Sequence, residues 1–383
     1  MFSVFHEDYM KHLFSGINKK RVRTKNEVRN IFQMPPDSPE TTILEKKTEN
    51  DNLDFKEKEA PKKHWKNLWC LFGYQDIKWF NTFLIAFIHL YLLYGFYMAI
   101  KRRLYIIILW NFAYAQFAAF GITGGAHRLY THRSYKANLP LRIILMIGYT
   151  AVGMNPIFEW VRDHRVHHKF SDTDADPHNA SRGFFFSHCG WLMMKKHPEV
   201  IKQGKKIDMT DILEDPVVQF HQKYYYPLTL ILCYVFPTVV PWYFWSCDLF
   251  DCFTISICRW VLSLNAVWAV NSAAHIWGNR PYDKNIYPAE NILVALWSYG
   301  EGWHNYHHTF PWDYKAAELS WFLNTTGILL NMFAAIGWAY DLKTPTKELI
   351  EKIVKKSGDG SHYKWGEEVP ESEGVRLIRK KIT

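Results

Sequence analysis

Nine of the 18 histidines fall in four short clusters of the sequence. They are His127 and His132, then His164, His167 and His168, then His275, and finally His304, His307 and His308. Imidazole is the commonest neutral ligand for first-row transition metals, and the packing of an ordinary core does not require nine such rings. The pattern therefore predicts a metal centre.

Helical geometry sorts these histidines into two sets. Residues four apart lie about 40° apart around a helix, whereas adjacent residues lie about 100° apart. In each His-x-x-His-His motif the first and third rings should therefore share one ion, and the middle ring should face another. This assigns His164, His168 and His307 to one ion, and His304, His308 and His167 to the other. The spacing thus predicts two ions linked by two motifs.

Two further spacings need a distorted or terminating helix. His127 and His132 are five residues apart, which is about 140° on an ideal helix, so they can share an ion only where the helix ends or distorts. A Gly-Gly pair lies just before them. Asn271 precedes His275 by four residues, so its amide could reach the same ion directly or through water.

The donor atoms indicate which metal the centre holds. Zinc usually takes four ligands, often with Cys, whereas a nitrogen-rich dinuclear centre with an open position suits iron and dioxygen. The six cysteines are scattered without paired spacing, although Cys247 and Cys252 could form a disulfide. The donor set therefore favours iron over zinc, and the resemblance given below implies two ferrous ions with dioxygen as co-substrate.

Four long apolar runs must carry these clusters, at 79–100, 104–126, 224–247 and 253–274. The first three contain no charged residue, and the fourth contains only Arg259. Each is long enough to cross a hydrocarbon core of about 30 Å as a helix. Two shorter apolar stretches, 143–154 and 327–339, are expected to lie at the membrane interface.

The distribution of basic residues predicts the topology. Of the 46 Lys and Arg residues, 42 lie before the first run, between the second and third, or after the fourth. Basic loops face the cytosol, so both termini and every histidine cluster are expected there. The remaining four are the local cluster Lys101 to Arg103 and Arg259, just inside the fourth run.

These observations predict an all-α integral membrane protein with four transmembrane helices under a cytosolic helical cap that holds the di-iron centre. A disordered cytosolic segment is expected at 1–65, the membrane domain at 66–345, with its cap from 127–223 and 275–345, and a cytosolic tail at 346–383. The net charge of +9 follows the topology, and no nucleic-acid-reading motif accompanies it. The first 14 residues lack the apolar core of a signal peptide, so the first span is expected to direct targeting.

Four long motifs carry a family resemblance: GAHRLYTHRSYKA, RDHRVHHKFSDTDADPHNASRGFFFSHCGW, NSAAHIWGNRPYDKN and GEGWHNYHHTFPWDY. They resemble the animal stearoyl-CoA desaturase family, most of all its insect branch, over about residues 65 to 360. The resemblance implies a mushroom-like helical fold that inserts a cis double bond into a saturated long-chain acyl-CoA, usually between carbons 9 and 10. It also implies one iron held by His127, His132, His164, His168 and His307, and another held by His167, His275, His304 and His308, with Asn271 acting through water.

The same resemblance implies a set of acyl-CoA contacts. They are Asn81, Asn155, Arg162, Asp163, Lys195, Lys196 and Trp268. Arg and Lys can neutralise phosphates, and Asn and Asp can bond the pantetheine or adenosine groups. Pro156 departs from the family beside Asn155, and the segment 287–290 carries a variant that leaves the double-bond position open.

Electrons must come from another protein, because the sequence has neither a dinucleotide-binding glycine fingerprint nor a haem-attachment motif. The basic cytosolic face suits acidic cytochrome b5, reduced by NADH-cytochrome b5 reductase. Lys380 and Lys381 resemble a dilysine retrieval signal, which predicts residence in the endoplasmic reticulum membrane. A desaturase of other regiochemistry and a membrane di-iron hydroxylase are the alternatives among enzymes. A metal transporter would need ionisable groups along its spans, and the runs contain almost none.

Several other side chains are candidates for supporting roles in the site or in helix packing. Asp172, Asp174, Asp176 and Glu301 either orient ligand imidazoles or lie at the surface. His89 is expected to pack between helices. The aromatic side chains Trp110, Tyr114 and Phe117 share one face of the second run. They either close the far end of an acyl tunnel or pack against lipid or a neighbouring span.

Overall fold

A computed structural model describes residues 77–319 and 323–366. All described residues belong to one compact unit. The segment predicted at 1–65 and the dilysine residues Lys380 and Lys381 lie outside the described residues.

Four helical segments among the described residues are long and apolar enough to cross a membrane, as predicted. They are α3 (Trp79–Lys101), α4 (Tyr105–Phe120) continued by the π-helix η2 (Gly121–Thr131), α10 (Pro216–Thr229) continued by the π-helix η5 (Leu230–Val235) and α11 (Phe236–Phe244), and α12 (Leu249–Asn271) followed by α13 (Ala273–Ile276). The third begins eight residues before the predicted 224, because Asp215 caps it by accepting from the backbone N–H groups of Val217 and Val218.

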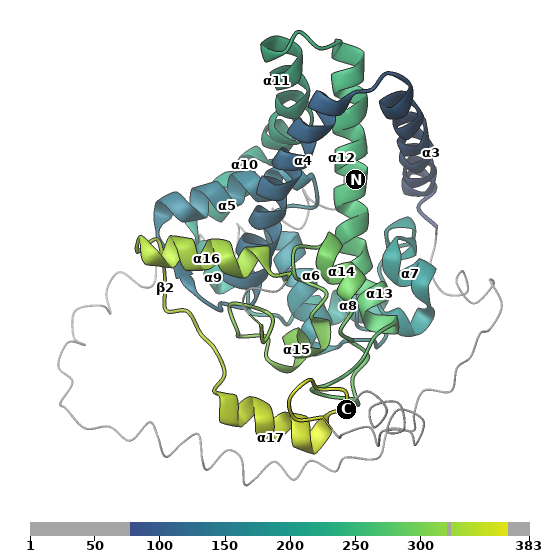
Figure 1. Cartoon of the computed structure of the whole chain (residues 1–383). Coiled ribbons are helices and arrows are strands. Elements are labelled where there is room, and N and C mark those ends of the chain that lie inside the picture. Colours follow the sequence, from purple (N-terminus) through teal and green to yellow (C-terminus); the bar gives the residue numbers. More distant parts are fainter. Residues whose placement is uncertain (1–76, 320–322, 367–383) are drawn as a thin grey trace, which may run out of the picture. The chain divides into compact units, whose positions relative to one another are not determined.

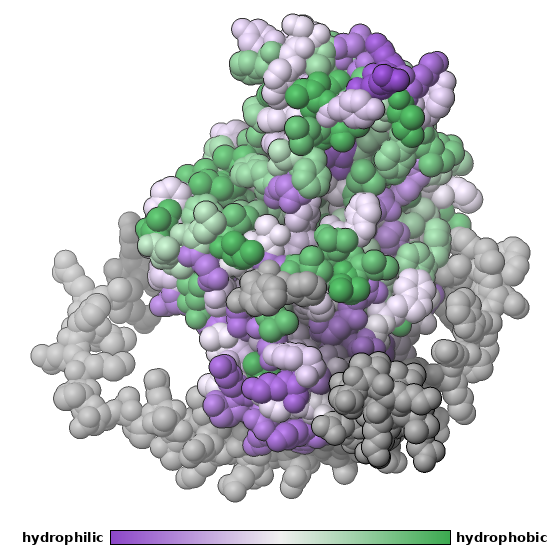
Figure 2. Space-filling view, viewed as in Figure 1, coloured by the Kyte–Doolittle hydropathy of each residue, from purple (hydrophilic) through white to green (hydrophobic). Residues whose placement is uncertain are grey.

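Short turns at 102–104 and 245–248 join the spans at the end opposite the histidines. In Figure 1, α3, α4, α11 and α12 run side by side away from the smaller helices. Their outer faces expose large apolar side chains such as Phe83, Phe87 and Phe112. Figure 2 shows hydrophobic residues over this part and hydrophilic residues gathered over α17. An apolar surface of this extent suits lipid rather than water.

Close helix packing positions the end of the second span. Helix α5 (Leu139–Val152) crosses η2, and a Cβ at Gly121 would lie 2.0 Å from the backbone nitrogen of Tyr149. Helix α6 (Ile157–Lys169) then departs from α5 at 85°. The bend is made by Gly153, whose φ is 68°, and by Pro156, which directly precedes α6.

The predicted apolar stretch 327–339 is only partly helical. Helix α16 spans Thr325–Ala335, and Gly337 with φ of 74° turns the chain. Strand β2 (Ala339–Tyr340) then pairs antiparallel with β1 (Lys136–Ala137). This two-residue pair is the one sheet within the described residues, and the fold is otherwise helical as predicted.

Short helices form the rest of the cap. They are η3 (Ala180–Arg182), α7 (Phe184–His188), η4 (Gly190–Met193), α8 (Pro198–Gly204), α9 (Thr210–Glu214), α14 (Ile292–Trp297), α15 (His304–Thr309) and α17 (Lys347–Ser357). Ile350 and Val354 of α17 pack with Tyr282, Tyr306 and Phe310. The segment after 346, predicted as a tail, therefore packs against the cap as far as Trp365.

Candidate metal centre and substrate site

The structure brings the nine clustered histidines together. Their ligand atoms form two groups, and within each group these atoms lie within 4.8 Å of one another. One group is His127, His132, His164, His168 and His307, and the other is His167, His275, His304 and His308. These are the two sets named in the sequence analysis. Asn271 ends α12 and is buried, four residues before His275.

A π-helix accounts for the five-residue spacing of His127 and His132. The backbone N–H of His132 donates to the carbonyl of His127 at 3.2 Å, which is an i to i+5 bond. The wider turn carries both imidazoles to one side, and their ring centroids are 4.9 Å apart. The expected distortion of this helix is therefore present.

Carboxylates from loops fix the orientation of three ligand rings. The pairs are His127 with Glu301 at 2.8 Å, His167 with Asp176 at 2.9 Å, and His275 with Asp172 at 3.1 Å. In each pair Nδ1–H must donate, because a carboxylate only accepts. The Nε2 atom of each ring therefore presents a lone pair to the histidine group. Asp174, in contrast, is exposed.

The distances between Nε2 atoms fit a bound cation. His307 Nε2 lies 3.0 Å from the Nε2 atoms of both His127 and His168. His304 Nε2 lies 3.0 Å from that of His275 and 3.1 Å from that of His308. Because His127 and His275 donate through Nδ1, their Nε2 atoms carry lone pairs. Two ring nitrogens this close must either share a proton in an N–H···N hydrogen bond or bind a common cation. A cation bound by the lone pairs would take the place of that proton.

Other ring nitrogens and the local charges agree with this fit. The Nε2 atoms of His132, His164 and His167 are buried without a hydrogen-bond partner. Burial, and next the neighbouring His127, lower the pKa of His132 and His164, so both rings are neutral as a metal ligand must be. Burial alone would raise the pKa of Glu301, but Arg128 and His127 hold it at about 2.

His178 is a site residue that the sequence analysis did not single out. It is buried beside His167 and Asp176, with which it forms a third group of possible ligands. Its ring meets the indole of Trp191 edge-on at 4.5 Å. Sequence spacing could not have identified it, because His178 lies in a loop. In a loop, unlike a helix, the spacing of residues does not indicate which side chains approach one another.

Five of the predicted acyl-CoA contacts gather where α3 begins. Asp163 on α6 binds Arg162 at 3.0 Å through one oxygen and Lys196 through the other. Burial alone would raise the pKa of Asp163, but Lys196 and Arg162 hold it at about 2. Asn81 donates its amide to the carbonyl of Leu192 at 2.9 Å, so it also anchors the chain that leads to Lys195 and Lys196.

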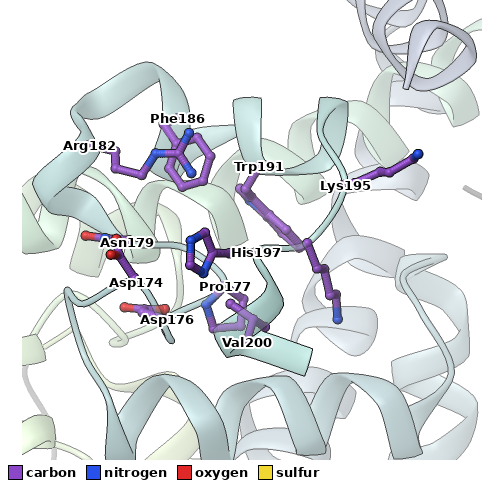
Figure 3. Close-up of a pocket in the computed structure, with 11 residues that line it drawn as sticks. Asp174, Asp176, Pro177, Asn179, Arg182, Phe186, Trp191, Lys195, His197 and Val200 are labelled. Atoms are coloured by element: carbon purple, nitrogen blue, oxygen red, sulfur yellow. The ribbon is translucent and has the colours of Figure 1, made fainter. Parts of the chain in front are cut away.

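A pocket adjoins the two lysines. Its lining includes Lys195, Lys196 and His197 together with Asp174 and Asp176. Figure 3 shows the Arg182 guanidinium over the ring of Phe186, at 3.6 Å from its centroid, and Lys195 extending away from the pocket. The pocket is therefore lined by charged side chains of both signs.

Trp268 and Asn155 lie apart from this cluster. Trp268 on α12 is buried, and its indole lies against the rings of His89 and His188. Asn265 joins those two histidines by accepting at Oδ1 from His188 at 3.1 Å and donating to His89 at 3.2 Å. His89 thus packs between helices, as expected. Asn155 lies between α5 and α6, where its carbonyl accepts from the hydroxyl of Tyr149.

The structure also places the remaining candidates. Cys247 and Cys252 are both free thiols. Arg259 lies in the middle of α12, buried, with its guanidinium donating to the carbonyls of Ala151 and Cys233. It therefore lies deeper in the span than the position just inside the fourth run at which the sequence analysis placed it.

The aromatic face of the second span contacts the third span. Trp110 Nε1 donates to the carbonyl of Pro237 at 3.0 Å, and the hydroxyl of Tyr114 donates to that of Leu232 at 2.6 Å. Phe117 lies 6.2 Å from Tyr114, measured between ring centroids. Two of these three aromatic side chains therefore hold neighbouring helices together.

Comparison with known proteins assigns the family. Residues 104–323 match the family described as Fatty acid desaturase. The chain is 54% identical over 299 residues to an acyl-CoA Delta-9 desaturase of Acheta domesticus, covering 76% of this chain and 82% of the relative. It is 51% identical over 288 residues to stearoyl-CoA desaturase 5 of Bos taurus (75% and 86%), and 48% identical over 303 residues to an acyl-CoA Delta(11) desaturase of Spodoptera littoralis (79% and 89%). The chain belongs to the fatty acid desaturase family, whose members among these relatives are acyl-CoA desaturases.

Proposed function

We propose that this protein is an acyl-CoA desaturase that inserts a cis double bond between carbons 9 and 10 of a saturated long-chain acyl-CoA. The observation that carries the proposal is the pair of all-histidine groups in a chain about half identical to named acyl-CoA desaturases. A desaturase of other regiochemistry remains the second candidate, because relatives named for Delta(11) and Delta12 activity are also about half identical.

We propose that the two groups hold iron. A group of five rings exceeds the four ligands usual for zinc, and neither group includes a cysteine. Both features favour the nitrogen-rich, higher-coordinate sites of iron. When bound, two irons would supply the reduction of dioxygen and the oxidising power needed to break an unactivated C–H bond.

The protein's own residues would bind and aim the substrate. Arg162, Lys195 and Lys196 would neutralise phosphates of the CoA nucleotide, and Asn81, Asn155 and Asp163 would bond its polar groups. Trp268 would line the apolar path of the acyl chain. Buried carboxylates keep the ligand rings in one tautomer, and the buried site limits the access of water.

The partners and location are proposed from the sequence. Electrons would come from cytochrome b5 and its NADH-dependent reductase, which agrees with the lack of a dinucleotide-binding glycine fingerprint and of a haem-attachment motif in the sequence. The enzyme would lie in the endoplasmic reticulum membrane with both termini cytosolic. The position of the four spans and the asymmetry of basic residues support this orientation.

Expression in desaturase-deficient yeast tests the function. Growth without added unsaturated fatty acid, with double bonds located in the cellular lipids, is the expected result. A hydroxylated product would replace the proposal with the hydroxylase alternative, and double bonds at carbon 11 or 12 would replace the regiochemistry. The matched control is His307→Ala, which should accumulate in the membrane without product.

A further inference from the structure

Helix α14 (Ile292–Trp297) of the cap is apolar on its outer side as well as on its inner side. Its buried side chains are Val294 and Ala295, and its other four residues are 55–68% exposed. These four are Ile292, Leu293, Leu296 and Trp297. No Asp, Glu, Lys or Arg occurs in 291–300. A helix that is apolar all round is expected in an apolar environment rather than at a surface in contact with water.

The outer side of α14 continues onto the end of α13 and onto α7. Asn291, which caps α14, donates its side-chain amide to the carbonyl of Trp277 at 3.0 Å. The exposed indole of Trp277 lies 5.2 Å from the exposed ring of Phe184 on α7, measured between ring centroids. Figure 2 shows hydrophobic residues over α14. We call the following six side chains the α14 face: Ile292, Leu293, Leu296, Trp297, Trp277 and Phe184.

Both ends of α14 adjoin helices that are long and apolar enough to cross a membrane. Beyond its C-terminal end, the hydroxyl of Tyr299 accepts from Nε2 of Gln116 at 3.0 Å, and Gln116 lies in α4, four residues before that helix ends. Next to its N-terminal end, Trp277 directly follows α13, the last turn of the fourth segment. Helix α14 also packs against α12, as Figure 1 shows. The α14 face therefore adjoins the exposed apolar surface of these helices.

Other cap helices and other partners show what this face does not suit. Helix α17 buries Ile350 and Val354 and exposes charged side chains such as Lys352 and Lys356, which is the pattern of a helix in contact with water. The α14 face has no basic side chain with which to attract an acidic protein. Tryptophan, which contributes two of its six side chains, is enriched where membrane meets water. Lipid acyl chains fit this composition and this position.

We propose that α14 lies within the bilayer leaflet on the side of the histidine groups, where the α14 face binds the acyl chains of phospholipids. This contact extends the membrane surface of the protein beyond its four spans, and it does not depend on which reaction the protein catalyses. It also reaches the metal centre. The backbone N–H of Gly300 donates to the carbonyl of Ala295 at 2.9 Å, and the next residue is Glu301, whose carboxylate orients His127. Lipid would therefore support the helix from which this loop departs.

Photolabelling of the full chain from within the bilayer tests this. The protein is placed in phosphatidylcholine nanodiscs that include phosphatidylcholine with a diazirine on one acyl chain, irradiated and digested, and the labelled residues are identified by mass spectrometry. Adducts are expected on residues 292–297, as on the outer faces of α3 and α4 at Phe83 and Phe112, which are the positive controls. None is expected on α17, although its Leu349 is apolar and exposed.

Variants sharpen the test. Leu293→Asp combined with Leu296→Asp should reduce the adducts on 292–297 severalfold and leave those on α3 and α4 unchanged, because carboxylates draw the face towards water. Leu349→Asp is the matched control and should change neither, and gel filtration verifies that each variant is folded.

The unaltered protein alone can overturn the proposal. Adducts on α3 and α4 without any on 292–297 would show that lipid does not reach α14. The same result with two chains in each nanodisc would assign the face to a second copy of the chain. Adducts on none of these helices would overturn the membrane assignment of the spans as well.

Discussion

Replacing Asp172 by Asn tests whether the loop carboxylates determine metal binding. Asp172 Oδ2 accepts from His275 Nδ1, and Oδ1 accepts from the backbone N–H of Ala180 at 3.0 Å. In the variant the amide oxygen can keep the Ala180 bond, but the NH₂ group then faces the ring. The imidazole must accept at Nδ1 and carry its proton on Nε2, the atom that faces the second histidine group. That proton blocks the lone pair needed for a metal.

The magnitude follows from the bond that is lost. The Asp172 side chain is only 4% exposed, so solvent does not screen the interaction. A hydrogen bond to a charged group contributes about 1.5–3 kcal/mol, which corresponds to roughly tenfold to a hundredfold in affinity. Replacing such outer carboxylates weakens metal binding by a similar factor. We expect the ion of the second group to dissociate at a correspondingly lower chelator concentration, while the first group keeps its ion.

The assay is iron content per chain after equilibrium dialysis against a series of chelator concentrations. Asp341→Asn is the matched control, because Asp341 also has a positive φ, of 52° against 60° for Asp172, and Asn tolerates both. Asp341 lies at the surface, where it pairs with Lys136. If Asp172→Asn keeps two irons at the same chelator concentration as Asp341→Asn, the carboxylate does not control the tautomer and the reasoning is wrong.

Four other outcomes are expected. His167→Ala and His307→Ala should each lose activity and one iron of two, measured by metal analysis; full activity in either would contradict the ligand assignment. Trp110→Ala and Tyr114→Ala should each lower the free energy of unfolding by about 3–5 kcal/mol. Phe117→Ala breaks no hydrogen bond, and the chain lengths of its products show whether longer acyl chains are admitted. The stabilising contribution of Asp163 is present above its unfolded pKa of 3.8 and is lost as pH falls towards about 2, so Asp163→Asn should remove that part of the acid dependence of unfolding. A glycosylation site engineered beside Thr383 should remain unmodified, because a cytosolic terminus is not glycosylated.

The parts of the site that sequence could predict are those set by local geometry. The His-x-x-His-His motifs lie on α6 and α15, where helical period alone determines which rings face the same way. The need for a distorted helix at His127 and His132 followed from the same period. The four spans followed from the length of their uncharged runs, which depends on composition alone.

The parts that could not be predicted depend on contacts between distant segments. Asp172 reaches His275 from a loop with positive φ, and Glu301 reaches His127 from more than 170 residues away. No spacing rule relates such pairs. Helix α17 has a sequence signal, since Ile350 and Val354 are four residues apart, although the segment 346–383 is expected to be a tail. The depth of Arg259 in its span depends on the carbonyls of Ala151 and Cys233, which the sequence does not bring together.

One helix carries both the predicted substrate anchor and three of the nine clustered histidines. On α6, Arg162 and Asp163 directly precede His164, and His167 and His168 follow within the next turn. A helix of this length is rigid, so the proposed phosphate site and the irons would keep a fixed separation. The carbon that is oxidised would then depend on the path of the acyl chain between them. Relatives named for Delta-9, Delta(11) and Delta12 activity should therefore differ along the apolar path beside Trp268, rather than at α6.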